Sequence, residues 1–166
     1  MYSLKHEMRR KFDEKSRGAS GDSLGSLEEG LLEKILNLSI SNLYTFEPVQ
    51  WQMVAVKSST GKYKLYSLAG NDPDLYGSCV TLIILENPES RHHIDLLAMS
   101  IMYAAKYYGV EFHQTQHFDR EGICREFGIA APLQPALLIG LGYFSSTQPI
   151  YAQPYRYSGW TIVREI

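Results

Sequence analysis

The sequence predicts an α+β protein with a short, mostly antiparallel sheet flanked by helices, one of them a long central helix. Two apolar runs of strand length, 79–85 and 135–144, predict buried strands. Two stretches with apolar residues at helical spacing, 27–39 and 90–108, predict amphipathic helices. Helices and strands do not alternate strictly along the chain, which favours an antiparallel sheet over a doubly wound parallel one.

Signals near the N-terminus predict a basic arm before the first helix. Residues 1–17 carry six Lys or Arg against three Asp or Glu, and a Gly- and Ser-rich stretch, SRGASGDSLGS, follows. Residues 1–26 are therefore expected to form a basic arm and a flexible loop. Ser26 and Glu29 have the spacing of a capping box, which predicts that the helix over 27–39 begins there.

The middle of the chain predicts a strand, a short helix and two loops. WQMVAV (51–56) has strand composition, and the SSTGK that follows is expected to be a turn. Residues 62–69 then predict a short helix ended by Gly70. Residues 71–78, NDPDLYGS, are rich in turn formers and predict a loop before the buried strand at 79–85.

The second half of the chain predicts two helices and two strands before an aromatic tail. Gly109 is expected to end the long helix, and the alternating residues 110–118 predict a third strand or an extended segment. Asp119 and Gly128 are the expected N-cap and C-terminal stop of a short helix. Residues 135–144 supply the fourth strand, and residues 145–166 form a tail rich in Tyr and Gln.

Length and composition limit the classes of function. The chain has 166 residues, 45% hydrophobic and 20% charged, which is typical of one globular domain over 1–166. The net charge of -2 predicts no general attraction to nucleic acid or to an anionic membrane. No apolar run reaches the roughly 18 residues that span a bilayer. Two cysteines are too few for a disulfide framework, which indicates a reducing, cytoplasmic location.

No side-chain constellation for catalysis or metal binding stands out. The GLG at 140–142 lacks the third glycine and the following helix of a dinucleotide fingerprint. His113 and His117 share one face of an extended segment, yet lie about 13 Å apart, so no metal site is expected from them. Cys79 and Cys124 are expected in apolar surroundings, where nothing lowers the pKa of a thiol.

Five short motifs occur in a particular order along the chain. They are MRRKFDEK (8–15), LLEKIL (31–36), FEPVQWQMVAV (46–56), LLAMSIMYAAKYYGVEFHQTQHFD (96–119) and the pair REFGI with PALLIGLGY (125–143). In this order they resemble the nitroreductase family of flavin-dependent oxidoreductases over most of residues 5–144. The resemblance implies a nitroreductase-like fold and a homodimer with FMN at the subunit interface. It also implies transfer of hydride from NAD(P)H to the flavin and on to a nitroaromatic, quinone or similar acceptor.

The resemblance also implies a set of cofactor-binding residues but no catalytic side chain, because the flavin carries the chemistry. Arg10 would lie near flavin N1, where reduction develops negative charge. Cationic groups would hold the phosphate. Glu47 has two interpretations: its carboxylate would disfavour the reduced flavin, or it would accept a hydrogen bond from ring N3–H. The complete set is His6, Met8, Arg9, Arg10, Phe46, Glu47, Gln116 and Arg156, of which His6, Arg9 and Arg156 are the phosphate candidates.

Departures from the family pattern leave an alternative open. The positions of the family's first Arg and its Ser are occupied by His6 and Met8, and the loop Asn position by Glu47. The positions of its glycine pairs are occupied by Val110, Glu111, Gln116 and His117. The alternative is a catalytically degenerate nitroreductase-fold protein that binds flavin weakly, or binds another ligand, as a sensor or binding module. A third interpretation, a structural or interaction protein, requires the resemblance to be accidental.

Overall fold

The structure is a computed structural model, and it describes residues 26–41, 43, 51–89 and 93–143. This part of the chain forms five helices and four strands. In chain order they are α2 (Leu31–Ser41), β1 (Gln52–Val56), α3 (Ser59–Leu68), α4 (Pro73–Gly77), β2 (Val80–Glu86), α5 (Ile94–Tyr107), β3 (Glu111–Thr115), α6 (Arg120–Phe127) and β4 (Gln134–Gly142).

The four strands form one sheet in the order β1-β2-β4-β3, and each neighbouring pair is antiparallel. One row of the sheet runs from Val54 through Ile83 and Leu138 to Thr115. A bulge between Ile84 and Leu85 shifts the register near the end of β2. The expected short antiparallel sheet is confirmed, with the two apolar runs as its central strands.

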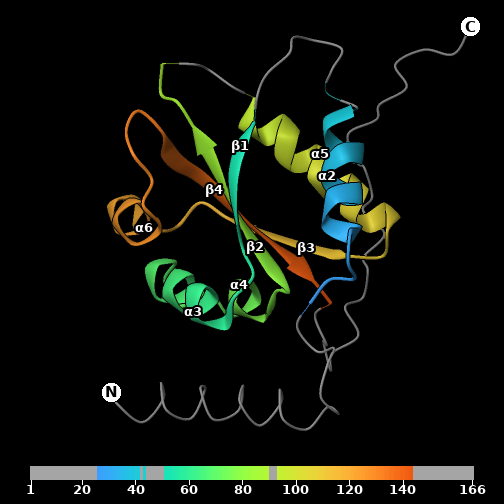
Figure 1. The fold of residues 1–166 in the computed structure, drawn as a ribbon, viewed down its shortest axis with the longest axis horizontal. Coiled ribbons are helices and arrows are strands. Elements are labelled where there is room, and N and C mark those ends of the chain that lie inside the picture. Colours follow the sequence, from blue (N-terminus) through green and yellow to red (C-terminus); the bar gives the residue numbers. More distant parts are fainter. Residues whose placement is uncertain (1–25, 42, 44–50, 90–92, 144–166) are drawn as a thin grey trace, which may run out of the picture.

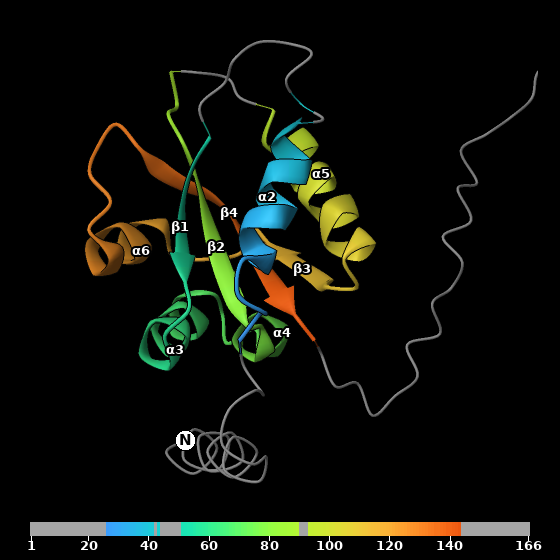
Figure 2. The same ribbon diagram turned by 45° about the vertical axis from the view of Figure 1, so that its right-hand side comes forward.

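Helices cover both faces of the sheet (Figures 1 and 2). Alternation along the central strands sends Leu82 and Ile139 to the core under α2 and α5. The intervening residues, such as Ile83 and Leu138, pack against α3, α4 and α6 on the opposite face. The fold is therefore a three-layer arrangement, and β2 and β4 are apolar on both faces because both faces are covered.

Several predicted boundaries are confirmed by local geometry. The Asp119 side chain accepts a hydrogen bond from the Gly122 N–H at 3.0 Å and caps α6, and Gly128 ends that helix with a left-handed backbone. Gly109, also left-handed with φ 71°, follows the end of α5. The long helix begins at Ile94 in the structure, and residues 90–92 lie outside the described part.

The helix predicted over 27–39 begins later than expected. α2 starts at Leu31 rather than at residue 27, so the expected capping box at Ser26 does not mark its start. Gly30 has φ 75°, a left-handed conformation that an α-helix cannot contain, and it blocks the extension toward the N-terminus.

Two segments predicted as turns or loops are helical. The Ser58 side chain accepts from the Gly61 N–H, so the expected turn is the first part of α3. In the predicted loop at 71–78, Asp72 caps α4 by accepting from two backbone N–H groups, and Pro73 occupies its first turn. Both signals, an Asp N-cap and a Pro at the helix start, are as typical of a helix start as of a turn.

Within the described residues, no helix has both the length and the apolar character needed to cross a membrane.

Candidate functional site

Most of the predicted flavin contacts lie outside the part of the chain that the structure describes. These are His6, Met8, Arg9, Arg10, Phe46, Glu47 and Arg156. They remain predictions. Gln116 is the member of the set whose position can be described.

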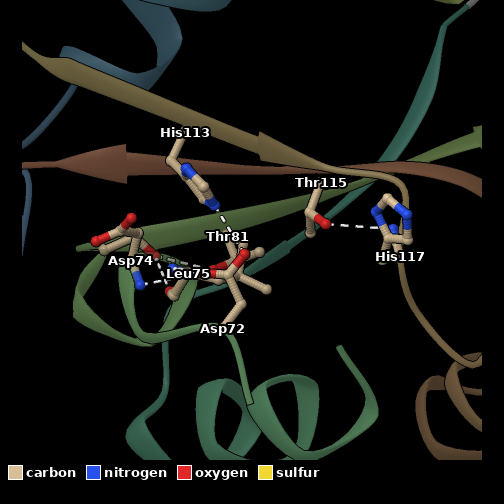
Figure 3. A network of polar contacts seen from close by, with 8 residues as sticks. Asp72, Asp74, Leu75, Thr81, His113, Thr115 and His117 are labelled. Carbon is tan, nitrogen blue, oxygen red and sulfur yellow. Dashed lines mark hydrogen bonds and ion pairs between the residues drawn. The ribbon is translucent and has the colours of Figure 1, made fainter. Parts of the chain in front are cut away.

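Gln116 lies directly after β3, in a short exposed segment (Figure 3 shows the flanking Thr115 and His117). The backbone N–H of His117 donates to the Thr115 hydroxyl at 3.2 Å, which turns the chain away from the strand. The segment is then anchored, because Phe118 packs in the core under α6 and the Asp119 N–H donates to the Leu68 carbonyl at 2.8 Å. The Gln116 amide is thus held on a short, anchored connection and faces solvent.

A cluster of polar side chains lies at the same end of the sheet. Gln134 Nε2 donates to Glu86 Oε1 at 3.3 Å, and Arg120 Nη1 lies 4.0 Å from the same oxygen. Gln134 begins β4, and Thr115 at the end of β3 pairs with Leu138 in that strand. Since β3 runs toward the start of β4, Gln116 lies at the end of the sheet that carries this cluster.

Gln116, the described member of the predicted set, is compatible with a flavin. The edge of an isoalloxazine ring carries both hydrogen-bond donors and acceptors, and a carboxamide supplies both in uncharged form. Gln116 is exposed, and among the described residues its side chain has no hydrogen-bond partner, so it is free to contact a ligand. The Gln116 carboxamide at the end of β3 is therefore chemically suited to contact the edge of a flavin ring.

A second polar arrangement, under α4, was missed by the sequence analysis. His113 Nε2 lies 2.8 Å from Asp72 Oδ2, and the two side chains are 28% and 19% exposed. His113 belongs to β3 and Asp72 caps α4, 41 positions earlier in the chain (Figure 3). No spacing rule connects two residues so far apart in the chain. Sequence spacing could therefore relate His113 to His117 but not to Asp72.

The electrostatics of this pair favour an ionised carboxylate. Partial burial alone would raise the pKa of Asp72, but the hydrogen bond from His113 and those from the Leu75 and Asp74 N–H groups outweigh it. The pKa of Asp72 therefore lies below its ordinary value. The arrangement presents an acceptor carboxylate next to an imidazole, a combination that can bind a cation or move a proton.

A buried lysine lies close to the same helix. Lys62 in α3 is 6% exposed, and its Nζ donates to the Ser78 carbonyl at 2.9 Å. Burial lowers the pKa of Lys62, partly offset by Cys79. The Ser78 hydroxyl in turn donates to the Leu75 carbonyl and contacts the Thr81 hydroxyl. These contacts fix the junction between α4 and β2.

The whole fold resembles solved nitroreductase structures. A nitroreductase-like protein from Streptococcus mutans matches with a TM-score of 0.63 and 15% identity, over 74% of this chain and 81% of that one. A nitroreductase family protein from Clostridium difficile 630 matches with a TM-score of 0.59 and 17% identity, over 73% and 75%. An FMN-dependent nitroreductase from C. difficile R20291 matches with a TM-score of 0.58 and 16% identity, over 76% and 82%.

The similarity lies in structure rather than in sequence. No protein-family model matches the chain, and no curated protein matches it. The solved structures nevertheless share the mixed helical and antiparallel architecture over about three quarters of the chain. The protein therefore has a nitroreductase-like fold, as its motif order predicted.

Proposed function

We propose that the protein is an FMN-dependent oxidoreductase of the nitroreductase type. The observation that carries the proposal is the match of its three-layer fold to nitroreductase structures, one of them named as FMN-dependent. The family motifs, which occur in the same order along this sequence, support it independently. We expect the protein to be located in a reducing, cytoplasmic compartment. This location is consistent with Cys79 and Cys124, which are both free thiols.

In this proposal the chain binds and orients, while FMN, when bound, accepts hydride from NAD(P)H and reduces a nitroaromatic, quinone or similar acceptor. Arg10 places positive charge beside the ring nitrogen that becomes anionic on reduction. His6, Arg9 and Arg156 hold the phosphate through charge-assisted hydrogen bonds. Gln116 contacts the ring edge from the end of β3.

We further propose that the active form is a homodimer that packs through α5. Four large apolar side chains are exposed on this helix at helical spacing: Leu96, Met99, Tyr103 and Tyr107, with exposed fractions of 43, 50, 48 and 77%. They form a stripe, here called the α5 stripe, opposite the face that buries Leu97 and Ile101 in the core. A helix that is apolar on both sides is typical of one that is buried on both sides. A second copy of the chain is the occupant that the family resemblance implies.

The proposal is tested with purified full-length protein and added FMN. We expect quenching of FMN fluorescence at saturation and absorbance near ~450 nm that bleaches on addition of NADH or NADPH. Menadione and nitrofurazone are suitable acceptors for restoring the oxidised spectrum. Arg10→Ala is expected to weaken FMN binding, whereas Arg125→Ala, an exposed arginine on α6, is the matched control. Absence of FMN binding at high micromolar concentration would refute the proposal.

One observation favours the second candidate function, a flavin-binding module without catalysis. Gln116 and His117 put two long side chains on the exposed connection after β3, at positions where the family resemblance expects glycines. Added bulk at a ring-facing segment would restrict the approach of nicotinamide or acceptor. The same experiment separates the two functions, because a binding module quenches FMN fluorescence but shows no bleaching by NADH or NADPH. Restored turnover in Gln116→Gly/His117→Gly would identify these side chains as the obstacle.

A further inference from the structure

Three side chains with metal-binding atoms lie close together beside α4. The one from β3 is three residues before Gln116 in the chain. The three side chains are those of Asp72, Asp74 and His113, and one ligand atom of each lies within 4.8 Å of the others (Figure 3). Asp72 and Asp74 flank the start of α4, and His113 comes from the edge strand of the sheet. The histidine spacing alone predicted no metal site, because it could not connect His113 with either aspartate.

The separations are close to those of ligands around one ion. Two neighbouring ligands at ~2.1 Å from a metal ion are themselves about 3.0–3.4 Å apart, and opposite ones about 4.2 Å apart. His113 Nε2 and Asp72 Oδ2, at 2.8 Å, are near the first value. All three ligand atoms lie within 4.8 Å of one another, a limit that exceeds the second value by about 0.6 Å. Asp74 is exposed, so rotation of its side chain closes that gap.

Asp72 is held in the orientation that such a site requires. Its Oδ1 accepts from the backbone N–H groups of Asp74 and Leu75 at 3.0 and 3.2 Å, which leaves Oδ2 directed at His113. Hydrogen bonds of this kind orient ligating carboxylates in metal sites. A simple tether between α4 and β3 accounts for the Asp72–His113 pair but does not involve the carboxylate of Asp74, which lies in the first turn of α4.

The sheet leaves room for this approach. His113 in β3 pairs with Gly140 in β4, and Gly140 pairs with Thr81 in β2. The three residues therefore occupy one row of the sheet under α4. A Cβ on Gly140 would lie 3.1 Å from the Ser78 Cβ and 3.6 Å from Leu75 Cδ1. The missing side chain therefore lets α4 approach the sheet closely enough for Asp72 to reach His113.

We propose that Asp72, Asp74 and His113 form a binding site for a divalent first-row transition metal ion such as Zn²⁺. One imidazole and two carboxylates suit Zn²⁺, Mn²⁺ or Co²⁺, whereas Ca²⁺ and Mg²⁺ prefer oxygen ligands throughout. The partial exposure of all three side chains leaves the remaining coordination positions to water. The site includes none of the predicted flavin contacts, and its ion would join the start of α4 to the edge strand β3.

The test is calorimetric titration of ZnCl₂ into EDTA-treated, dialysed full-length protein at neutral pH. We expect one site, weakened by about 10-fold or more in Asp74→Asn and His113→Gln. Asp74→Asn is the decisive variant, because it retains the Asp72–His113 contact and the cap of α4. His117→Gln, which removes an exposed histidine four positions further on, is the matched control and should bind as the parent does.

A second readout separates a metal site from a structural tether. Zn²⁺ should raise the melting temperature of the parent protein and of His117→Gln, and should raise that of Asp74→Asn by less at the same Zn²⁺ concentration, since the stabilisation by a ligand grows with the ratio of its concentration to its Kd. Three results would each overturn the proposal: no Zn²⁺ binding by the parent protein, equal binding by Asp74→Asn, or binding of Ca²⁺ as tight as that of Zn²⁺ and unaffected by His113→Gln.

Discussion

Gly142 lies so close to Cys79 that a Cβ on the glycine would come within 2.7 Å of the Cys79 backbone nitrogen. The Cys79 N–H donates to the Leu141 carbonyl at 2.8 Å, so this nitrogen cannot withdraw without losing a hydrogen bond of the sheet. The GLG sequence at 140–142 thus has a packing role: its two glycines let the α4–β2 junction lie against β4.

We therefore expect Gly142→Ala to lower the free energy of unfolding by about 1–3 kcal/mol, the usual cost of an overpacked interior. Gly140→Ala should cost less, because its new Cβ would meet a side-chain atom, the Ser78 Cβ, at 3.1 Å rather than backbone. Urea unfolding of both variants checks the order. Equal stability of Gly142→Ala and the parent protein would show that the close approach is relieved without cost.

Lys62 predicts a specific pH dependence of stability. Because burial lowers its pKa in the folded state, the unfolded chain binds more protons on average than the folded chain between that pKa and about 10.4. The free energy of unfolding contributed by this group therefore rises with pH across that window. Lys62→Met should remove the rise, while Lys57→Met, at an exposed lysine outside the core, should retain it.

The measurement is urea unfolding at several values from neutral pH upward to pH ~10, with the two variants compared with the parent protein. Cys79 is the titratable group that faces Lys62, so Lys62→Met/Cys79→Ala compared with Cys79→Ala separates the two contributions. A pH slope of Lys62→Met identical to that of the parent protein would contradict the assignment.

The α5 stripe predicts a change of oligomeric state on substitution. Met99→Lys places a charge in the middle of the stripe, where a second copy would have to bury it, so the dimer should dissociate about 10-fold or more readily. Light scattering coupled to size-exclusion chromatography measures the mass. Ser67→Lys, on the exposed side of α3, is the matched control and should leave the mass unchanged. A parent protein that is monomeric at every concentration would refute the dimer.

The N-cap of α6 predicts a modest, specific loss of stability. Asp119→Ala removes the acceptor for the Gly122 N–H and should lower the free energy of unfolding by about 1 kcal/mol. Asp119→Asn should retain most of the stability that the cap contributes, because asparagine caps a helix as well as aspartate does. Thermal or urea unfolding of the two variants provides the comparison, and equal losses in both would point to the charge instead of the cap.

The order of elements and the sheet were predictable because both depend on local patterns. The apolar runs of β2 and β4 and the cap signals at Asp119 and Gly128 each act within a few residues. Errors arose where one residue type serves two structures. Asp72 and Pro73 begin turns as readily as helices, and the burial of Leu75 in the core favours the helix at α4.

The polar sites were predictable only in part. The motif order assigns Gln116 to the flavin site, and this assignment stays a prediction. The meeting of Asp72 with His113 depends on the order of strands in the sheet and on the missing side chain of Gly140. Such a meeting has no trace in sequence spacing. All the flavin contacts that the resemblance implies stay predictions, and every one except Gln116 lies outside the described residues.

The two central strands, β2 and β4, tolerate few substitutions. A substitution on β2 or β4 disturbs packing on one face or the other, since helices cover both. Exposed polar groups, such as Gln116 after β3 and Asp74 in the first turn of α4, can be exchanged with less disturbance of the packing. The same fold can therefore be built from very different sequences, provided that both faces of β2 and β4 stay apolar, and the three solved structures with this fold are only 15–17% identical to this chain.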